Sequence, residues 1–319
     1  MSDNSATDVV TLGETMALFR AAHPGPLMHA SEMTLGMGGS ESNFAIALRR
    51  LGSTVTWVGR IGADSFGEYI RRELAAEQVD SDIVVDSTAP TGLMIKERRT
   101  ASTQKVWYYR AGSAGSRLAP EDLPLEKIRG ARVLHVTGIT PALSESAAST
   151  VNRAIEVARD AAVTVALDVN YRTSLWSTDV AGKTLGKLAA RADIVFASED
   201  EAALVVGPAT DAAELARRIA ELGPAQVIIK LGAHGCAALI DGLELRSDAI
   251  KVDALDTVGA GDGFVAGYIS ELLAGSKPST RLDTAVRVGA FACLVPGDWE
   301  GMPRRAELGL LDSSEPVTR

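Results

Sequence analysis

Short apolar runs alternate with amphipathic segments through the second half of the chain. Five largely apolar runs have the length of buried strands: 132–136, 163–167, 192–197, 226–230 and 236–240. Residues 143–162 repeat apolar positions every three or four residues after Ser144, a favoured N-cap, and 211–222 form a second such segment. Strands that alternate with helices predict a parallel sheet covered by helices on both faces, with ligands beyond the carboxyl ends of its strands.

The first third of the chain has a different pattern. Residues 9–12 and 54–58 resemble core strands, and 40–51 form a helix between them. Residues 92–97 and 105–110 are joined by a polar turn, and we predict an antiparallel hairpin. We expect one domain over 1–319, with a small β-lid built mainly from 90–112 and part of 14–36.

Composition narrows the class of protein. The chain has 319 residues, 46% of them hydrophobic, and a net charge of −9, which disfavours a nucleic-acid partner. No apolar stretch approaches the roughly 20 residues that span a membrane, and residues 1–8 are polar, unlike a signal peptide. The two cysteines and four histidines fit no metal-ligand or redox spacing. We expect a cytoplasmic protein with buried free thiols.

One glycine-rich motif precedes an apolar helix. Residues 256–262 read Asp-Thr-Val-Gly-Ala-Gly-Asp, and a helical repeat of apolar residues begins at Phe264. The N–H groups of a helix N-terminus favour an anion, and glycines let a phosphate approach the backbone. Asp262 would then accept the proton of a hydroxyl that attacks phosphorus. The alternative is a helix capped by ordinary turn residues.

Other candidate motifs each have a structural alternative. Gly38 and Gly39, with Asn43, would bind a polar ligand or simply turn the chain into a helix; Glu41 stands where a dinucleotide fingerprint needs its third glycine. Residues 181–184 lack the spacing and the preceding strand of a phosphate loop, and we interpret them as a solvated helix face.

The strand ends carry further polar residues. Lys230, Gly232 and Gly235 follow a buried strand, where they form a tight turn or approach a base or phosphate. Ser198 and Glu201 form a capping box, and Glu201 could also hold magnesium through water. Arg110 and Arg172 each follow a predicted strand, and Tyr108 lies close to the first of them. Arginines bind carboxylates and phosphates with paired hydrogen bonds, so their presence in an acidic protein favours a site for an anionic small molecule.

Together these residues resemble the PfkB, or ribokinase-like, carbohydrate kinases. The 256–262 motif is similar to the family's C-terminal signature, and the Gly38-Gly39 motif with Asn43 is similar to its N-terminal one. The resemblance implies a doubly wound, mostly parallel α/β sheet in three α/β/α layers, with a small β-sheet lid. Within the family, five stretches are most similar to 2-keto-3-deoxygluconate kinases: 108–116, 138–143, 167–172, 175–176 and 297–298. Fructokinases share parts of the 108–116 and 167–172 stretches, so these two alone do not separate the two kinds of kinase.

The resemblance also implies roles for single residues. Asp262 would be the catalytic base, and Gly259, Ala260 and Gly261 the anion hole. Substrate contacts would come from Gly38, Gly39, Asn43, Tyr108, Arg110, Arg172 and Asp262. ATP contacts would come from Asn170, Ser198, Lys230, Gly232, Gly235, Gly259 and Gly261. Glu201 would hold Mg²⁺ through water, although Ser198 stands where many members have the asparagine of the magnesium motif.

The implied reaction is ATP-dependent phosphorylation of 2-dehydro-3-deoxygluconate at its terminal hydroxyl, giving the 6-phosphate. The alternatives are a fructokinase or another neutral-sugar kinase and, in another class, a non-catalytic sugar- or nucleotide-binding protein. The sequence leaves open the gluconate or galactonate epimer, a monovalent cation, the role of Met94 in the lid, and a homo-oligomer formed through the exposed lid edge.

Overall fold

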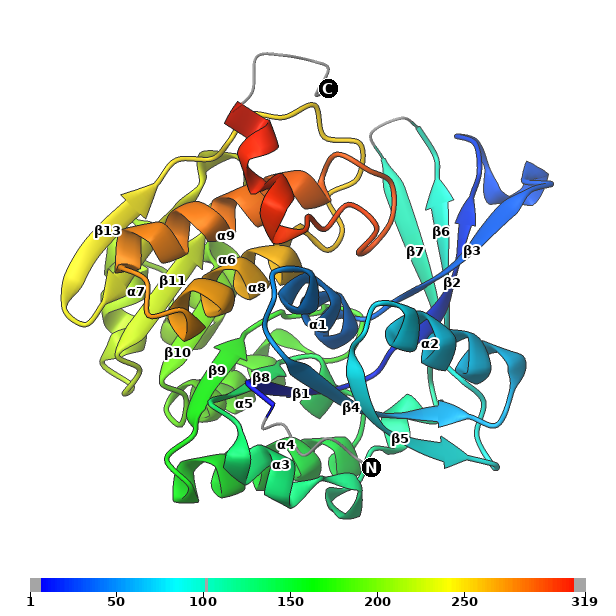
Figure 1. The fold of residues 1–319 in the computed structure, drawn as a ribbon, viewed down its shortest axis with the longest axis horizontal. Helices are drawn as coiled ribbons and strands as arrows, with labels where there is room; N and C mark the ends of the chain where they lie inside the picture. The colour runs from blue at the N-terminus through cyan, green and yellow to red at the C-terminus, as the bar shows by residue number, and fades with distance from the viewer. Residues whose placement is uncertain (1–6, 101–102, 313–319) are drawn as a thin grey trace.

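A large sheet forms the centre of the protein. The computed structural model describes residues 7–100 and 103–312. Within them the sheet has nine strands in the order β13-β12-β11-β10-β9-β8-β1-β4-β5 (Figure 1). Their bounds are β1 Val9–Leu12, β4 Val55–Gly62, β5 Asp80–Asp86, β8 Val133–Thr137, β9 Thr164–Asp168, β10 Ile194–Ser198, β11 Gln226–Lys230, β12 Cys236–Ile240 and β13 Leu243–Ser247.

Helices cover both faces of this sheet. Successive strand residues point to opposite faces, so Val9 packs in one apolar core and Val10 in the other. The first core is closed by α1 (Ser40–Arg50), α2 (Ser65–Ala76), α8 (Ala260–Leu273) and α9 (Pro278–Ala292). The second is closed by α3 (Leu125–Gly130), α4 (Glu145–Asp160), α5 (Thr178–Ala189), α6 (Glu199–Val206) and α7 (Ala212–Ala220). The predicted three-layer α/β/α arrangement is confirmed.

A second, four-stranded sheet projects from one side of the body (Figure 1). Its order is β3-β2-β6-β7, with bounds β2 Met16–Ala21, β3 Met33–Gly38, β6 Leu93–Arg98 and β7 Gln104–Tyr109. We call this sheet the lid. Strands β6 and β7 pair antiparallel, which confirms the predicted hairpin. Part of its turn, residues 101 and 102, lies outside the described residues.

The predicted helices and strands agree closely with the structure where the pattern of apolar residues is regular. Strands β11 and β12 have the predicted bounds, and Ser144 caps α4 by accepting a 3.0 Å hydrogen bond from the Ala147 N–H. Strand β12 runs antiparallel to β11, whereas the alternating pattern alone predicts a parallel neighbour. Only residues 231–235 separate these two strands, and a parallel crossover needs a dozen residues or more.

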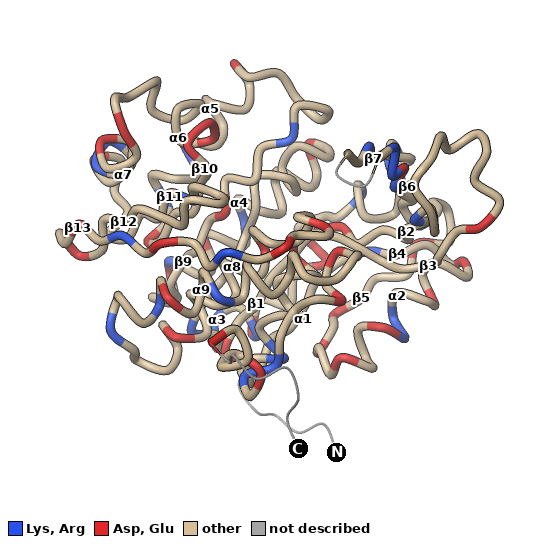
Figure 2. Tube along the Cα trace, turned by 90° about the horizontal axis from the view of Figure 1, so that it is seen from above, with Lys and Arg blue, Asp and Glu red and all other residues tan. Residues whose placement is uncertain are grey.

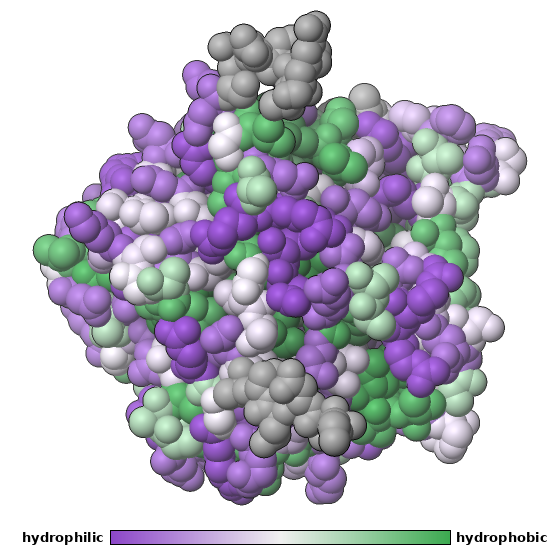
Figure 3. Space-filling view, viewed as in Figure 1, coloured by the Kyte–Doolittle hydropathy of each residue, from purple (hydrophilic) through white to green (hydrophobic). Residues whose placement is uncertain are grey.

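The surface is polar and mixed in charge. Acidic and basic residues are interspersed along the chain, and several basic residues lie on β6 and β7 (Figure 2). On the face seen in Figure 3, small apolar groups are separated by hydrophilic residues. Among the described residues, no helix is long and apolar enough to cross a membrane.

Candidate active site

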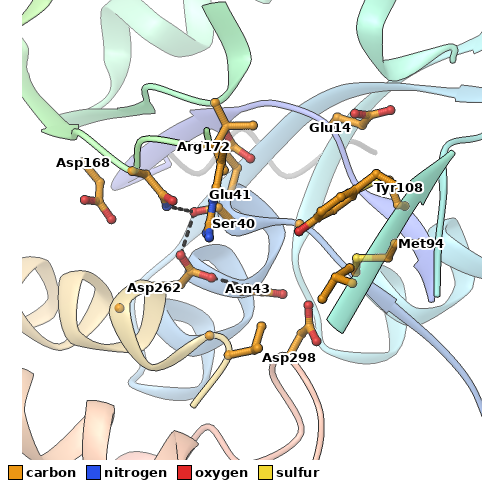
Figure 4. Close-up of a pocket in the computed structure, with 18 of the residues that line it drawn as sticks. Glu14, Ser40, Glu41, Asn43, Met94, Tyr108, Asp168, Arg172, Asp262 and Asp298 are labelled. Carbon is orange, nitrogen blue, oxygen red and sulfur yellow. Dashed lines mark hydrogen bonds between the residues drawn. The ribbon is translucent and has the colours of Figure 1, made fainter. Parts of the chain in front are cut away.

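A cavity of about 400 Å³ lies between the carboxyl edge of the large sheet and the lid. Residues from β6 and β7 form its lid wall, and the carboxyl ends of β9, β10 and β11 form the opposite wall together with the start of α8 (Figure 4). The cavity brings together most of the candidate residues predicted from the sequence: Gly39, Asn43, Tyr108, Arg110, Asn170, Arg172, Ser198, Glu201, Lys230, Gly259, Gly261 and Asp262.

Asp262 lies in the first turn of α8 and is only 7% exposed. Its Oδ1 accepts a 2.6 Å hydrogen bond from Ser40 Oγ, and its Oδ2 accepts a 2.8 Å hydrogen bond from Asn43 Nδ2 (Figure 4). Burial raises the pKa of Asp262, while the two hydrogen bonds and the charges of Arg172 and Lys230 lower it. The result is a carboxylate of raised basicity that is held in one orientation by two donors.

The turn before α8 depends on glycine. Gly259 is the N-cap and has φ +80°, and a Cβ there would lie 1.8 Å from the carbonyl oxygen of Asp298. A Cβ on Gly261 would instead have Lys230 Nζ, at 3.7 Å, as its nearest neighbour. Gly261 therefore presents open backbone to the cavity beside a lysine. The Ala260 N–H donates a 3.4 Å hydrogen bond to Thr257 O, which makes it the least available of the three predicted anion-hole amides.

Lys230 lines the cavity beside the turn before α8. Its Nζ donates a 2.7 Å hydrogen bond to Asp168 Oδ1 at the end of β9. Burial lowers the pKa of Lys230, but the charges of Asp168, Glu201 and Asp262 outweigh it, and the net shift is upward. Burial raises the pKa of Asp168 to about 6. Lys230 therefore remains a cation next to the open backbone of Gly261.

The predicted capping box at α6 is present. Ser198 Oγ accepts a hydrogen bond from the Glu201 N–H, and Glu201 Oε2 accepts one of 2.7 Å from the Ser198 N–H. Glu201 Oε1 also accepts a 2.9 Å hydrogen bond from the Tyr171 N–H. Both oxygens are thus held by backbone. No group of three or more potential metal-ligating side chains occurs in the described part of the chain.

The two predicted arginines have different surroundings. Arg110 Nε donates a 2.7 Å hydrogen bond to the fully buried Glu14, and its guanidinium lies 5.7 Å from the centre of the Tyr108 ring. Arg172 lines the same cavity and is exposed, and no hydrogen bond or ion pair joins its guanidinium to another described residue. The guanidinium of Arg172 therefore forms no ion pair within the described residues, although its charge lowers the pKa of Asp262, whereas Arg110 is already paired with Glu14.

Four predicted residues lie outside the walls of the cavity. Gly38 is directly behind one wall, where a Cβ would lie 2.3 Å from Asp298 Oδ2 and 2.5 Å from Met94 Cε. Ala260 lies between two residues of the wall. Gly232 begins the short 3₁₀ helix Gly232–His234 after β11 and Gly235 follows it, with φ of +55° and +84°. A nucleotide role for these two residues stays a prediction.

Several buried polar residues of the cavity were not identified from the sequence. Ser40 bridges Asp262 and Asn170, whose Nδ2 donates a 2.7 Å hydrogen bond to Ser40 Oγ. The other missed residues are Glu14, Glu41, Lys96, Asp168 and Asp298. Their signal was weak because single charged residues next to glycines or strand ends are common on protein surfaces, and only the fold reveals that these are buried.

Glu41 is the most enclosed of these carboxyl groups. Its Oε1 accepts hydrogen bonds from Thr137 Oγ1 at 2.6 Å and Thr140 Oγ1 at 2.8 Å. Its Oε2 is buried without a partner among the described residues. Burial raises the pKa of Glu41 to about 7, and the charge of Asp262 adds to this shift.

Known proteins are similar to this chain in both sequence and fold. The profile of the pfkB family carbohydrate kinases matches residues 6–305. The 2-dehydro-3-deoxygluconokinase of Bacillus subtilis (strain 168) is 36% identical over 97% of this chain and 96% of its own. The 2-dehydro-3-deoxygalactonokinase of Haloferax volcanii is 30% identical over 91% of this chain and 92% of its own. The crystal structure of the Thermotoga maritima 2-dehydro-3-deoxygluconokinase superposes with a TM-score of 0.90 and 26% identity, covering 96% of this chain and all of that one. The chain belongs to the pfkB family of carbohydrate kinases.

Proposed function

We propose that the chain phosphorylates 2-dehydro-3-deoxygluconate at its terminal hydroxyl, using ATP and giving the 6-phosphate. One observation supports this substrate class most directly: the unpaired cation Arg172 and the buried base Asp262 line the same cavity. A sugar acid carries a carboxylate at one end and a hydroxyl at the other, and these two residues offer a partner to each. The relatives named as kinases of such acids support the same assignment.

In this reaction Asp262 Oδ accepts the proton of the terminal hydroxyl as the hydroxyl oxygen bonds to the γ-phosphorus of ATP. The bond between that phosphorus and its bridging oxygen breaks, and ADP leaves with the electron pair. The N–H groups at the start of α8 face the developing negative charge, and Lys230 adds a positive charge beside Gly261. Positioning and charge stabilisation supply most of such catalysis, because the protein forms no covalent bond to the phosphoryl group.

The cavity also offers groups for the rest of the sugar. Arg172 would bind the carboxylate with charge-assisted hydrogen bonds. Asn43 Oδ1 is buried without a partner in the described residues, so it can accept a hydrogen bond from a sugar hydroxyl. Tyr108 lies across the cavity on the lid, where it would cover the bound sugar (Figure 4). Closure of the lid would exclude water, which otherwise competes with the sugar as nucleophile.

Mg²⁺ fits this site as a companion of ATP. Bound Mg²⁺ would neutralise charge on the nucleotide phosphates. Mg²⁺ usually keeps several waters and takes few protein ligands. Glu201 lines the cavity with both oxygens held by backbone N–H groups, an arrangement that suits contact through water. Ser198 and Lys230 lie at the adjacent strand ends and would contact the nucleotide.

Three features of the wider protein stay predictions. Trp107 and Tyr109 are exposed on the lid strand β7, and we infer that this sheet pairs with a second copy. A monovalent-cation requirement and a cytoplasmic location also remain to be measured.

The proposal is tested by ADP release with Mg²⁺ and ATP on a panel of acceptors: 2-dehydro-3-deoxygluconate, its galacto epimer, fructose and ribose. We expect turnover on the acids and little on the neutral sugars. Preference for fructose or ribose would keep Asp262 as the base and remove the carboxylate assignment. ATP binding without turnover on any acceptor would favour a non-catalytic binding protein.

A further inference from the structure

A buried lysine of the lid is joined to two buried aspartates of the body. Lys96 lies on β6 with 2% of its side chain exposed. Its Nζ forms ion pairs with Asp298 Oδ1 and, at 3.4 Å, with Asp256 Oδ2. The aspartate side chains are 5% and 1% exposed. Buried charges are costly unless they are paired, so this cluster fixes the lid strand and the two aspartates to one another.

Both aspartates hold the turn that carries the anion hole. Asp256 begins that turn, and its Oδ1 accepts a 3.0 Å hydrogen bond from the Val258 N–H. Its Oδ2 accepts a 3.2 Å hydrogen bond from the Gly297 N–H. The carbonyl oxygen of Asp298 lies directly against Gly259, the N-cap of α8. Asp298 therefore contacts both the Lys96 ammonium and the backbone of Gly259.

Lys96 is placed to support the site rather than to bind substrate. It lines the cavity, but its ammonium is buried and faces two carboxylates. Burial raises the pKa of Asp298 to about 6, with Asp256 adding to the shift, whereas the charge of Lys96 lowers it. Without the lysine, two carboxylates would face each other beside the turn with no cation between them.

We propose that Lys96 is a positioning residue that couples the lid to the anion hole. Its ammonium holds Asp256 and Asp298, and these two residues hold the backbone of the turn before α8 in the geometry that phosphoryl transfer needs. The anion hole is then complete only while strand β6 holds the Lys96 ammonium against the two aspartates. This inference rests on the proposed kinase activity and adds a residue that no sequence motif indicated.

The test compares Lys96→Met with a matched surface variant, Lys127→Met. Lys127 also bridges two aspartates, Asp80 at 2.8 Å and Asp82 at 2.9 Å, but its side chain is 41% exposed and does not line the cavity. The kcat and the two KM values are measured for each folded protein with whichever acceptor the wild type phosphorylates. We expect Lys96→Met to lower kcat about 100-fold, the effect of a small misplacement of catalytic groups, with both KM values little changed. Lys127→Met should match the wild type.

A second measurement restores the charge. Lys96→Ala, expressed and purified with propylammonium present, should regain turnover as the amine concentration rises, and propanol should give no recovery. A normal kcat in Lys96→Met, or recovery with propanol, would overturn the proposal. A rise confined to the KM of the sugar would make Lys96 a substrate ligand and would overturn it too. The substrate assignment is tested separately, by the acceptor preference of the wild type. Its failure can therefore be told apart from failure of the role proposed for Lys96.

Discussion

Ser40 Oγ donates a 2.6 Å hydrogen bond to Asp262 Oδ1, joining two residues that are 222 positions apart in the chain. Ser40 is the first residue of α1, and Asp262 is in the first turn of α8. The N-termini of two helices therefore converge on one carboxylate, and both helix dipoles favour its charged form. This arrangement offsets part of the burial that raises the pKa of Asp262.

Ser40→Ala should move the pH dependence of turnover. The hydrogen bond from Ser40 lowers the pKa of Asp262, so its removal raises that pKa further. Asp262 must be deprotonated to act as the base. The acidic limb of the profile of kcat against pH should therefore shift to higher pH in the variant. Ser149→Ala is a matched control, because Ser149 is exposed and, within the described residues, its hydroxyl bonds only to the Glu145 carbonyl oxygen in α4. An unshifted limb in Ser40→Ala would show that this bond does not tune the base.

Asp262→Asn should remove most of the turnover without unfolding the protein. The amide keeps the shape of the carboxylate but cannot accept the hydroxyl proton, and general bases contribute about 100- to 10,000-fold. The loss should appear in kcat, measured by ADP release, while ATP still binds in a calorimetric titration. Normal turnover in this variant would mean that another group accepts the proton.

The sequence predicts the layers and the main motifs because both depend on local patterns. Strand β11, the capping box of Ser198 and Glu201, and the glycine turn before α8 all depend on residues close together in the chain. Lys96 and Asp298 could not be paired in this way, because 202 positions separate them and each alone resembles a surface charge.

Arg110 shows that a residue can be placed in the site correctly from the sequence while the pairing of its charge is missed. An arginine after a strand in an acidic chain suggests an anion site, and Arg110 does line the cavity. Its charge, however, is matched by the buried Glu14, a residue that carries no motif and lies 96 positions away. Sequence patterns can place a cation in a site, but whether that charge is free for a ligand depends on contacts made through the fold.

Arg172→Ala should weaken binding of the sugar acid selectively. Hydrogen bonds to charged groups contribute about 1.5–3 kcal/mol, so the KM of the acid should rise about 10- to 100-fold. The KM of any neutral sugar that the enzyme accepts should change little, since such a sugar has no carboxylate. Parallel kinetics on an acid and a neutral acceptor check this. An equal rise for both acceptors would assign Arg172 to the nucleotide or to the structure instead.

Arg110→Ala should destabilise the protein as well as alter the site. The variant leaves Glu14 fully buried without its cation, and breaking such a pair costs about 3–5 kcal/mol. Thermal unfolding should show a clear fall in Tm, and adding Glu14→Gln to the variant should recover part of it. A Tm equal to that of the wild type would mean that Ser113, which also donates a hydrogen bond to Glu14, is enough to hold the carboxylate.

Glu41→Gln should stabilise the protein increasingly as the pH rises. The pKa of Glu41 is raised from 4.5 to about 7 by burial, so the folded state holds a proton that the unfolded state releases. The free energy of unfolding of the wild type therefore falls between pH 4.5 and pH 7, whereas the glutamine side chain of the variant cannot ionise. The free energy of unfolding of the variant minus that of the wild type should be lowest at about pH 4 and larger by up to about 3 kcal/mol at about pH 8. Urea unfolding at both pH values measures it, with Glu156→Gln on the exposed face of α4 as the control. A difference that stays constant with pH would show that Glu41 ionises in the folded protein as readily as in the unfolded chain.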